Sequence, residues 1–351
     1  MGMPIILQRM NEVEKSLKEA ISRINSLEDD LKKANDKIFA LENTSSYNIL
    51  NPYANLKDMN LYKMQPHCHT TPESEDSPKN TASLVADTYK AKGYDIICST
   101  NHDIISTKSL GLGDSNSLYN GLLILDGIEE QLIGNRHLSA IFAKRNVGTA
   151  EDVGGSKGTF TATEAINAHI TDGAYIGWSH PTRENGSNFN TIYSLPSPNF
   201  IEIINKNAGT NDEALLDNYL LKGVKVHAMA TDDCHDITNE NYVDKAWIQI
   251  YAKELTISAI KESLKAGRYY SSTGNDISIV MAKDKITVTS SNESIIEVIS
   301  DGKVVSTVTG TVQTYVLNGT EKYIRFRSTL VSDKNKKAYS NPILLLDNFN
   351  V

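Results

Sequence analysis

The chain has 351 residues, of which 40% are hydrophobic and 22% are charged, and its formal net charge is −8. This composition is ordinary for a globular protein of two or three domains. A chain this acidic is not expected to bind nucleic acid or membrane surfaces in general, because such binders are normally basic. Its 3 cysteines do not make a disulfide framework and fit a reducing compartment. No apolar run approaches the roughly 20 residues of a membrane helix, and no signal-peptide pattern is present, so we expect a cytoplasmic protein.

The first segment, residues 1–44, carries an unbroken heptad pattern. Apolar residues recur at alternating spacings of three and four over about five heptads, with polar residues between them. The two series are Met10, Leu17, Ile24, Leu31 and Ile38, and Val13, Ala20, Leu27, Ala34 and Leu41. This pattern predicts a self-associating coiled-coil helix, with packing on the chain's own globular part as the alternative. Ile21, at an e position, widens the apolar stripe and favours a trimer.

The remaining chain divides into three predicted parts. Residues 45–60 lack periodicity and are predicted to be a linker. In residues 61–275, short apolar strands alternate with amphipathic helical stretches, which predicts a parallel α/β sheet or barrel. The helices are expected at 81–92, 163–170, 212–221 and 258–266, the first three followed by a glycine that suits a left-handed cap. Residues 276–351 are rich in β-type segments, with a hairpin signal at Asp301–Gly302, and predict a small all-β domain of sandwich type.

Side chains that bind metals follow the predicted strands of the α/β part. The histidines are His67, His69, His102, His137, His180 and His235, and the acids beside them are Asp103, Glu129, Glu130 and Asp233. Active sites of α/β barrels and sheets are built at the carboxyl ends of their strands. So many such groups on one rim would cost solvation and charge repulsion unless cations were present. We therefore predict a metal cluster.

Four other residues of these types are interpreted as structural. His169 falls in a predicted helix and His227 in the middle of a predicted strand. Cys68 and Cys234 each stand between two proposed ligands, and thiolates bind zinc. Strand alternation turns them away from a site that their neighbours face, so we expect small buried residues.

The motifs around these residues resemble those of the PHP (polymerase and histidinol phosphatase) superfamily. In the family's order they are His67-Cys-His69-Thr70, Ser99-Thr-Asn-His102-Asp103, Gly127-Ile-Glu129, His180-Pro181 and Thr231-Asp-Asp233-Cys-His235. The resemblance implies a distorted (β/α)7 barrel that binds two or three divalent metal ions, Zn, Mn or Fe. The stretch 267–274 and the β-rich tail resemble a branch in which a small β domain follows the barrel.

Carried over to this sequence, the resemblance implies a ligand set for each metal. The first metal would be held by His67, His69, Glu129 and Asp233, and Glu129 would bridge to a second metal held by His137 and His180. The third would be held by His102, His235 and an acid from the loop after the first motif, where Asp76 is preferred and Glu75 or Glu73 are alternatives. Asn101 stands where members usually have Asp, so the support of His102 is expected to differ.

The expected function is that of a metal-dependent phosphoesterase, which hydrolyses a phosphomonoester or phosphodiester with a metal-activated hydroxide. Asp103 or His235 is expected to protonate the leaving group. Arg183, Arg136 and Lys206 are candidates to contact the substrate phosphate, although solvated surface charge explains them equally well. The alternative is an oligomeric structural protein of the fibre or phage-tail type that carries the barrel as a module and resides in a virion.

Overall fold

The structure is a computed structural model, and it describes residues 3–71, 77–105, 111–112, 117–132, 136–147, 160–185 and 190–349. The chain divides into two compact units. One comprises Met1–Ser46 with Ala282–Asp284, and the other comprises Tyr47–Met281 with Lys285–Val351. Each unit is described by itself.

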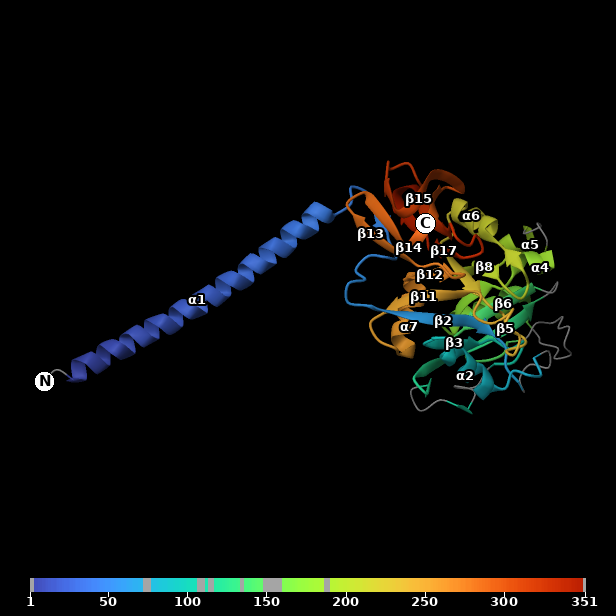
Figure 1. The fold of residues 1–351 in the computed structure, drawn as a ribbon, viewed down its shortest axis with the longest axis horizontal. Coiled ribbons are helices and arrows are strands. Elements are labelled where there is room, and N and C mark those ends of the chain that lie inside the picture. The colour runs from blue at the N-terminus through green and yellow to red at the C-terminus, as the bar shows by residue number, and fades with distance from the viewer. Residues whose placement is uncertain are drawn as a thin grey trace. The chain divides into compact units, whose positions relative to one another are not determined.

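The first unit is dominated by α1 (Met3–Asn43), a single continuous helix (Figure 1). The heptad pattern therefore correctly predicted a helix. Its apolar seam is exposed in one copy of the chain, with exposed fractions of 59% for Leu17 and 67% for Leu27. The side chains of Ile38 and Leu41 lie outside the described residues. Self-association of this helix stays a prediction. Among the described helices, none combines the length and the hydropathy that a bilayer crossing demands.

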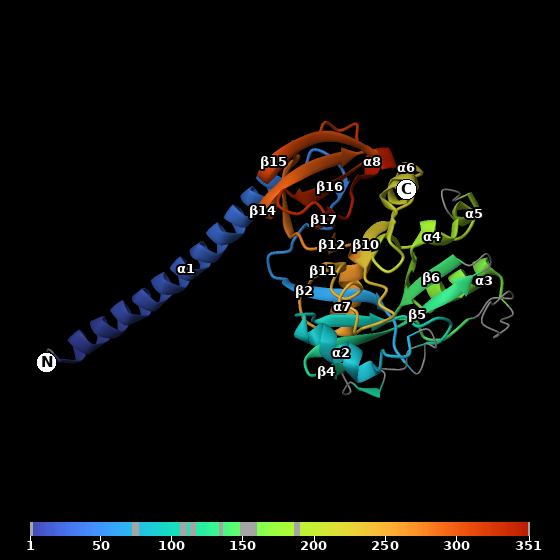
Figure 2. The same ribbon diagram turned by 45° about the vertical axis from the view of Figure 1, so that its right-hand side comes forward.

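The second unit contains a curled sheet that begins with β2. Its strands, in hydrogen-bonded order, are β2 (Asn60–Cys68), β3 (Ile96–Ser99), β5 (Leu122–Leu132), β6 (Arg136–Ile141), β7 (Tyr175–Trp178), β8 (Phe200–Asn205) and β10 (His227–Thr231). The end of β10 returns to the end of β2, where Cys68 and Cys234 form a parallel bridge and the Asp233 N–H donates to the His67 carbonyl at 3.1 Å. Figure 2 shows β2, β5 and β6 at this sheet. The predicted α/β class is confirmed.

Helices connect these strands close to the predicted positions. They are α2 (Ala82–Ala91), α3 (Ala162–Thr171), α6 (Glu213–Leu221) and α7 (Ile257–Ala266), with short helices α4 (Pro181–Asn185) and α5 (Asn190–Tyr193). Thr161 and Glu164 form a reciprocal capping box at the start of α3. Gly93, Gly173 and Gly223 follow α2, α3 and α6 with φ of 80°, 82° and 77°, a conformation that glycine adopts without strain.

Two features of the sheet differ from the sequence prediction. The sheet is not all parallel, because β6 runs antiparallel to both β5 and β7. In addition, β5 continues to Leu132, so Glu129 and Glu130 lie within a strand instead of after one. Both differences have one cause: β5 and β6 form a hairpin, so no helix intervenes to restore the strand direction. As a result, the first residues of β6 lie at the end of the sheet where the parallel strands finish.

Further strands extend this sheet into the C-terminal part. β11 (Trp247–Ala252) pairs with β2 and β12 (Tyr269–Ser272), and β12 pairs with β17 (Lys337–Ser340). The other C-terminal elements are β13 (Ile277–Ala282), β14 (Lys285–Ser300), β15 (Lys303–Val316), β16 (Tyr323–Leu330), β18 (Ile343–Leu345) and α8 (Leu346–Phe349). The predicted β-type segments 285–289, 294–299, 303–308 and 314–317 are merged into the long hairpin β14–β15, whose turn has positive φ at Asp301 and Gly302, as predicted.

The segment predicted as a linker packs on these C-terminal strands. β1 (Ile49–Leu50) pairs with β18, and the buried Tyr53 donates its hydroxyl to the Tyr269 carbonyl at 3.0 Å. The two remaining short strands are β4 (Leu118–Tyr119), beside β5, and β9 (Thr210–Asn211), beside β8. The domain boundaries and the sandwich arrangement stay predictions.

Candidate metal centre

The predicted ligands converge at the end of the sheet where β2, β3, β7 and β10 finish. Three groups of described residues each bring one ligand atom per member within 4.8 Å of the others. The groups are His67, His69, Glu129 and Asp233; His102, Glu129 and His137; and His69, His102 and His235. Because the groups share members, the side chains form one continuous cluster of imidazole and carboxylate ligands.

Glu129 stands at the centre of this cluster and divides its two oxygens between different histidines. Its Oε2 lies 3.2 Å from Nε2 of His67 and 3.3 Å from Nε2 of His69. Its Oε1 lies 2.9 Å from Nδ1 of His137 and 3.1 Å from Nε2 of His180. The side chain of Glu129 is fully buried. This is the arrangement that a carboxylate needs to bridge two cations.

The ligand atoms of the first group are arranged to bind a divalent cation, and this explains their positions better than direct hydrogen bonds between the side chains. Nε2 of His67 and Nε2 of His69 are 3.1 Å apart. Both also lie close to Oδ1 of Asp233, at 3.2 Å and 3.0 Å. Two imidazole nitrogens that face each other cannot both act as acceptors without a donor between them. A metal ion would accept a lone pair from each nitrogen and from the carboxylates.

The third group lies toward solvent. The rings of His69 and His235 have centroids 3.9 Å apart, and those of His69 and His102 are 4.8 Å apart. The side chains of His102 and His235 each retain 20% exposure. Nδ1 of His235 lies 2.9 Å from the Asp233 carbonyl oxygen and 3.1 Å from Nδ2 of Asn207. The acid expected to complete this group, Asp76 with its alternatives Glu75 and Glu73, lies outside the described residues.

Glu202 is a functional candidate whose contacts the sequence analysis missed. Its Oε1 lies 2.7 Å from Nδ1 of His67, and its Oε2 accepts the backbone N–H of His180 at 2.9 Å and Nδ2 of Asn205 at 2.9 Å. A carboxylate on Nδ1 fixes the ring orientation and directs the Nε2 lone pair into the cluster. No local spacing marks Glu202, since it lies inside the buried strand β8.

The backbone is strained at three residues of this rim. Asp103, His180 and Asp233 have φ of 52°, 27° and 54°, in the region that residues other than glycine rarely adopt. Such conformations cost about 1–3 kcal/mol each and are found preferentially at functional sites. At Asp233, this conformation turns the carboxylate back toward β2, where it meets both imidazoles of the first motif.

The electrostatics of His67 and Glu129 agree with a cation site. Burial alone would lower the pKa of His67, but the carboxylates of Glu129, Glu202 and Asp233 raise that pKa well above its usual value. Burial would raise the pKa of Glu129, but His67 and other histidines hold it well below the usual range. The side chain of Glu129 is thus ionised, and the positive charge that the neighbouring acids favour at His67 is a charge that a metal ion would supply.

His69 and Asp233 are already in the protonation states that metal binding requires. Burial, together with the neighbouring His235, lowers the pKa of His69. The pKa of Asp233 is lowered as well, because His67 and His69 outweigh the effect of burial. Nδ1 of His69 is buried without a hydrogen-bond partner in the described part of the chain. A neutral imidazole and an ionised carboxylate are the forms that bind metals.

The other predicted residues lie around the cluster. Oδ1 of Asp103 accepts the N–H of Gln131 at 2.8 Å, so this oxygen supports the backbone of β5. Arg183 is exposed on α4, Arg136 is half-buried at the start of β6, and Lys206 is half-buried just after β8. Asp103 belongs to none of the three ligand groups found among the described residues.

The residues interpreted as structural lie away from the ligand groups. His169 is buried and lies 3.0 Å from Oε2 of Glu130, so Glu130 has a partner outside the cluster. His227 is the first residue of β10, not a mid-strand residue, and contacts the hydroxyl of Tyr175 at 2.7 Å. Cys68 and Cys234 are free, buried thiols, and burial raises the pKa of both. Neither thiol belongs to the three ligand groups found among the described residues.

No family model matches the chain, and no curated protein has a significantly similar sequence. A solved structure from Bacteroides vulgatus, a two-domain protein containing a predicted PHP-like metal-dependent phosphoesterase, matches 86% of this chain and 100% of its own, with 16% identity and a TM-score of 0.46. The lesion-specific endonuclease EndoQ of Pyrococcus furiosus matches 59% of this chain and 56% of its own, with 16% identity and a TM-score of 0.44. PsfC of Pseudomonas syringae matches 58% of this chain and 88% of its own, with 15% identity and a TM-score of 0.39.

These similarities concern the fold, and this chain spans little more than half of EndoQ. In fold, the chain is similar to a two-domain protein that contains a predicted PHP-like metal-dependent phosphoesterase.

Proposed function

We propose that the protein is a metal-dependent phosphoesterase that hydrolyses a phosphomonoester or phosphodiester. The observation that carries this proposal is the buried convergence of His67, His69, Glu129 and Asp233, with ligand atoms within 4.8 Å of one another. A mixed set of nitrogen and oxygen ligands suits Zn, Mn or Fe. Two or three metal ions would be held, with Glu129 between the first and the second.

When bound, the metal ions would supply a nucleophile near neutral pH and positive charge for the phosphoryl oxygens. The chain's own residues position this chemistry. Glu202 orients His67 through Nδ1, and Glu129 keeps the two histidine pairs on opposite oxygens. His235, whose side chain retains 20% exposure, is our candidate proton donor to the leaving alcohol. Asp103 is the alternative donor, and Arg183 is the candidate to contact the phosphate.

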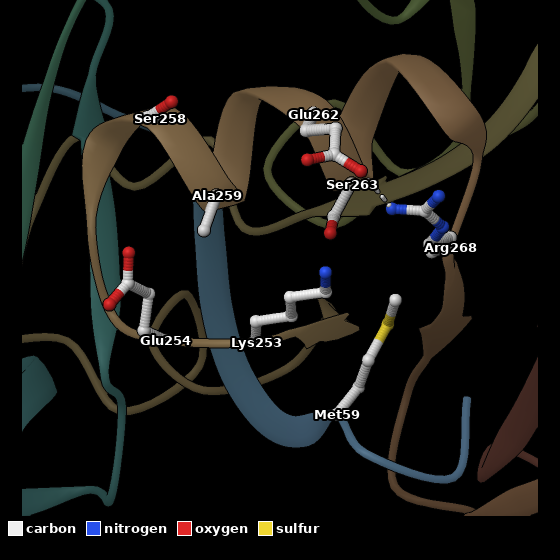
Figure 3. A pocket seen from close by; sticks show the side chains of 8 residues that line it. All are labelled: Met59, Lys253, Glu254, Ser258, Ala259, Glu262, Ser263 and Arg268. Carbon is white, nitrogen blue, oxygen red and sulfur yellow. Dashed lines mark hydrogen bonds and ion pairs between the residues drawn. The ribbon is translucent and has the colours of Figure 1, made fainter. Parts of the chain in front are cut away.

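The test combines metal analysis with turnover. Protein purified without chelators should contain roughly two or three equivalents of Zn, Mn or Fe per chain. It should release phosphate from a panel of monoesters and diesters. His67→Ala should lose at least one equivalent of metal and about 100-fold or more of the activity. The control is Glu262→Gln, which removes a surface carboxylate at the shallow pocket of Figure 3. Protein that stays metal-free after incubation with all three metals would refute the proposal.

A second function, oligomeric and structural, is favoured by the exposed heptad face of α1. Met10, Leu17 and Leu31 retain exposed fractions of 63%, 59% and 63% in a single copy. An apolar stripe of this length is expected to be covered by further copies of the chain, preferably as a trimer. The two functions are separable: His67→Ala should abolish phosphate release and leave assembly unchanged. Assembly without turnover of any phosphate ester would favour the structural role alone.

A further inference from the structure

A groove of about 230 Å³ lies where the curled sheet meets the C-terminal β strands. One wall is the turn after β8, with Lys206 and Thr210. The facing wall is the turn between β16 and β17, with Lys334 and the adjoining Lys337. The groove therefore takes residues from two parts of the chain that are more than a hundred residues apart, and β strands beyond the curled sheet help to form it.

This groove lies beside the metal centre. Asn205, the last residue of β8, lines it and is fully buried. Nδ2 of Asn205 donates to Oε2 of Glu202 at 2.9 Å and to Oδ2 of Asp233 at 3.2 Å. Glu202 orients His67, and Asp233 belongs to the first ligand group. One amide side chain thus separates the groove from the proposed metal ligands, at the same end of the sheet.

Three lysines, Lys206, Lys334 and Lys337, and no carboxylate line the groove. Within the described part of the chain none of the three is in an ion pair at contact distance, and Asp232 is a carboxylate whose charge acts on Lys206. Burial lowers the pKa of Lys206; Lys337 and Lys245 lower it further, whereas Asp232 raises it. The chain as a whole carries a net charge of −8, so unpaired lysines gathered at one place are not an average property of its surface.

The pocket in Figure 3 shows the contrast. There Arg268 donates to Glu262 at 2.7 Å, and Glu254 supplies a further carboxylate. The chain itself therefore provides the negative charges in that pocket. In the lysine groove, carboxylates are missing from the lining residues, so the complementary anion has to come from outside.

We propose that the lysine groove binds a second phosphate group of the substrate, while the first phosphate is hydrolysed at the metal centre. This inference rests on the proposed phosphoesterase function and narrows its substrate to esters that carry at least two phosphates. Lysine suits this role because its ammonium group binds phosphate as a point charge. The two phosphates could belong to a bisphosphorylated small molecule or to successive nucleotides at the end of a strand, and the chemistry recognised is the same.

The test compares matched esters on the metal-loaded, full-length protein. The measured quantity is the ratio of kcat/KM for butanediol bisphosphate to kcat/KM for butyl phosphate. Wild-type protein should prefer the bisphosphate by about tenfold or more, since hydrogen bonds between ions are among the strong ones. The double variant Lys334→Gln, Lys337→Gln should bring the ratio close to one. The matched control is Lys225→Gln with Lys265→Gln, two exposed lysines outside the groove, which should keep the preference.

Two further arms separate the possible failures. Binding of butane bisphosphonate and of butylphosphonate is measured by calorimetry, which needs no turnover. If no ester is hydrolysed but the bisphosphonate binds more tightly in a manner that depends on Lys334 and Lys337, the phosphoesterase function fails and the groove stands. If esters are hydrolysed but wild type and the lysine variant show the same ratio and the same binding, the groove proposal is overturned.

A short oligonucleotide with a terminal phosphate identifies the kind of substrate that supplies the second phosphate. A lysine-dependent preference for the oligonucleotide over butyl phosphate assigns the second phosphate to a nucleotide strand. A preference limited to the bisphosphate assigns the second phosphate to a small molecule.

Discussion

Glu202 contacts the candidate metal centre through His67 without belonging to any of the three ligand groups. Its contact of 2.7 Å with Nδ1 of His67 leaves Nε2 of that ring free to face the cluster. Glu202→Gln keeps the shape of the side chain but removes its charge. We expect the affinity for the most tightly bound metal to fall by about 10–100-fold, the range seen when such supporting carboxylates are lost. Titration of chelator-treated protein with Zn or Mn measures this affinity, and an unchanged value would show that Glu202 does not orient His67.

Asp212 is a buried acid whose effect on the free energy of unfolding depends on pH. It precedes α6 without a side-chain capping bond, and burial raises its pKa to about 6. The unfolded chain has a value of about 3.9. Between about pH 3.9 and about pH 6, Asp212 is protonated in the folded state and ionised in the unfolded state. Stability therefore falls as pH rises through this window and stays lowered above it.

Asp212→Asn removes this ionisation. The variant should match wild type below about pH 4 and exceed its free energy of unfolding by up to about 3 kcal/mol at neutral pH. Urea unfolding at a series of pH values measures the difference. Asp58→Asn, at an exposed position, serves as the control. A difference between Asp212→Asn and wild type that does not change with pH would contradict this account.

The sequence pattern contains the residues that the structure brings together in the three candidate ligand groups, but it does not mark the residues that support them. His67, His69 and Asp233 were recognisable because His-x-His and Asp-x-His spacings at strand ends combine into motifs with a fixed order. Glu202 and Asn205 belong to no such motif. Their contacts with the ligand groups follow only from the pairing of β8 with β7 and β10, which the local sequence does not show. The distances among these side chains arise from pairing between strands that are far apart in sequence.

At the scale of elements, helices were predicted more accurately than strand directions. The helices α2, α3, α6 and α7 begin and end within two residues of the predicted positions, because amphipathic periodicity and glycine caps are local signals. The direction of β6 was wrong, since alternation of strands and helices suggested parallel order throughout. A local signal for this hairpin is present in the sequence, because Gly134-Asn135 stands between the two strands and a Gly-Asn pair is typical of a hairpin turn; that signal was missed.

The helix α1 allows a prediction about its apolar seam. Leu17→Lys with Ile24→Lys places two charges at positions that the heptads assign to the interface. We expect this variant to sediment as a monomer, while wild type sediments as an oligomer, preferably a trimer, because a buried lysine without a partner is strongly unfavourable. Ser22→Lys with Asp29→Lys adds lysines on the opposite, polar face and should leave assembly intact. Wild-type protein that is monomeric at micromolar concentration would refute the coiled coil.

At the scale of the second unit, the curled sheet and the C-terminal strands share a buried ionic network. Arg325, on β16, has a side chain only 3% exposed and lies 2.9 Å from Glu213 and 2.7 Å from Asp217, both on α6. Tyr323 donates its hydroxyl to Asp217 at 2.7 Å as well. Buried charges of this kind are tolerated only while every partner is present. This network therefore joins residues on the two sides of the predicted boundary near residue 275.

Arg325→Met should destabilise this whole unit. Removal of the guanidinium leaves Asp217 buried without its main cation, and loss of one partner from a buried pair costs about 3–5 kcal/mol. Arg145→Met, which breaks the exposed pair with Asp172, is the control and should cost at most about 1 kcal/mol.

Denaturant unfolding should be followed with two probes, tryptophan fluorescence for the curled sheet and bound metal for the site. Because the network joins α6 to β16, we expect both probes to shift together to lower denaturant in Arg325→Met. If the metal signal kept its wild-type midpoint while other signals shifted, the C-terminal strands would be unfolding alone, and the network would not couple them to the metal centre.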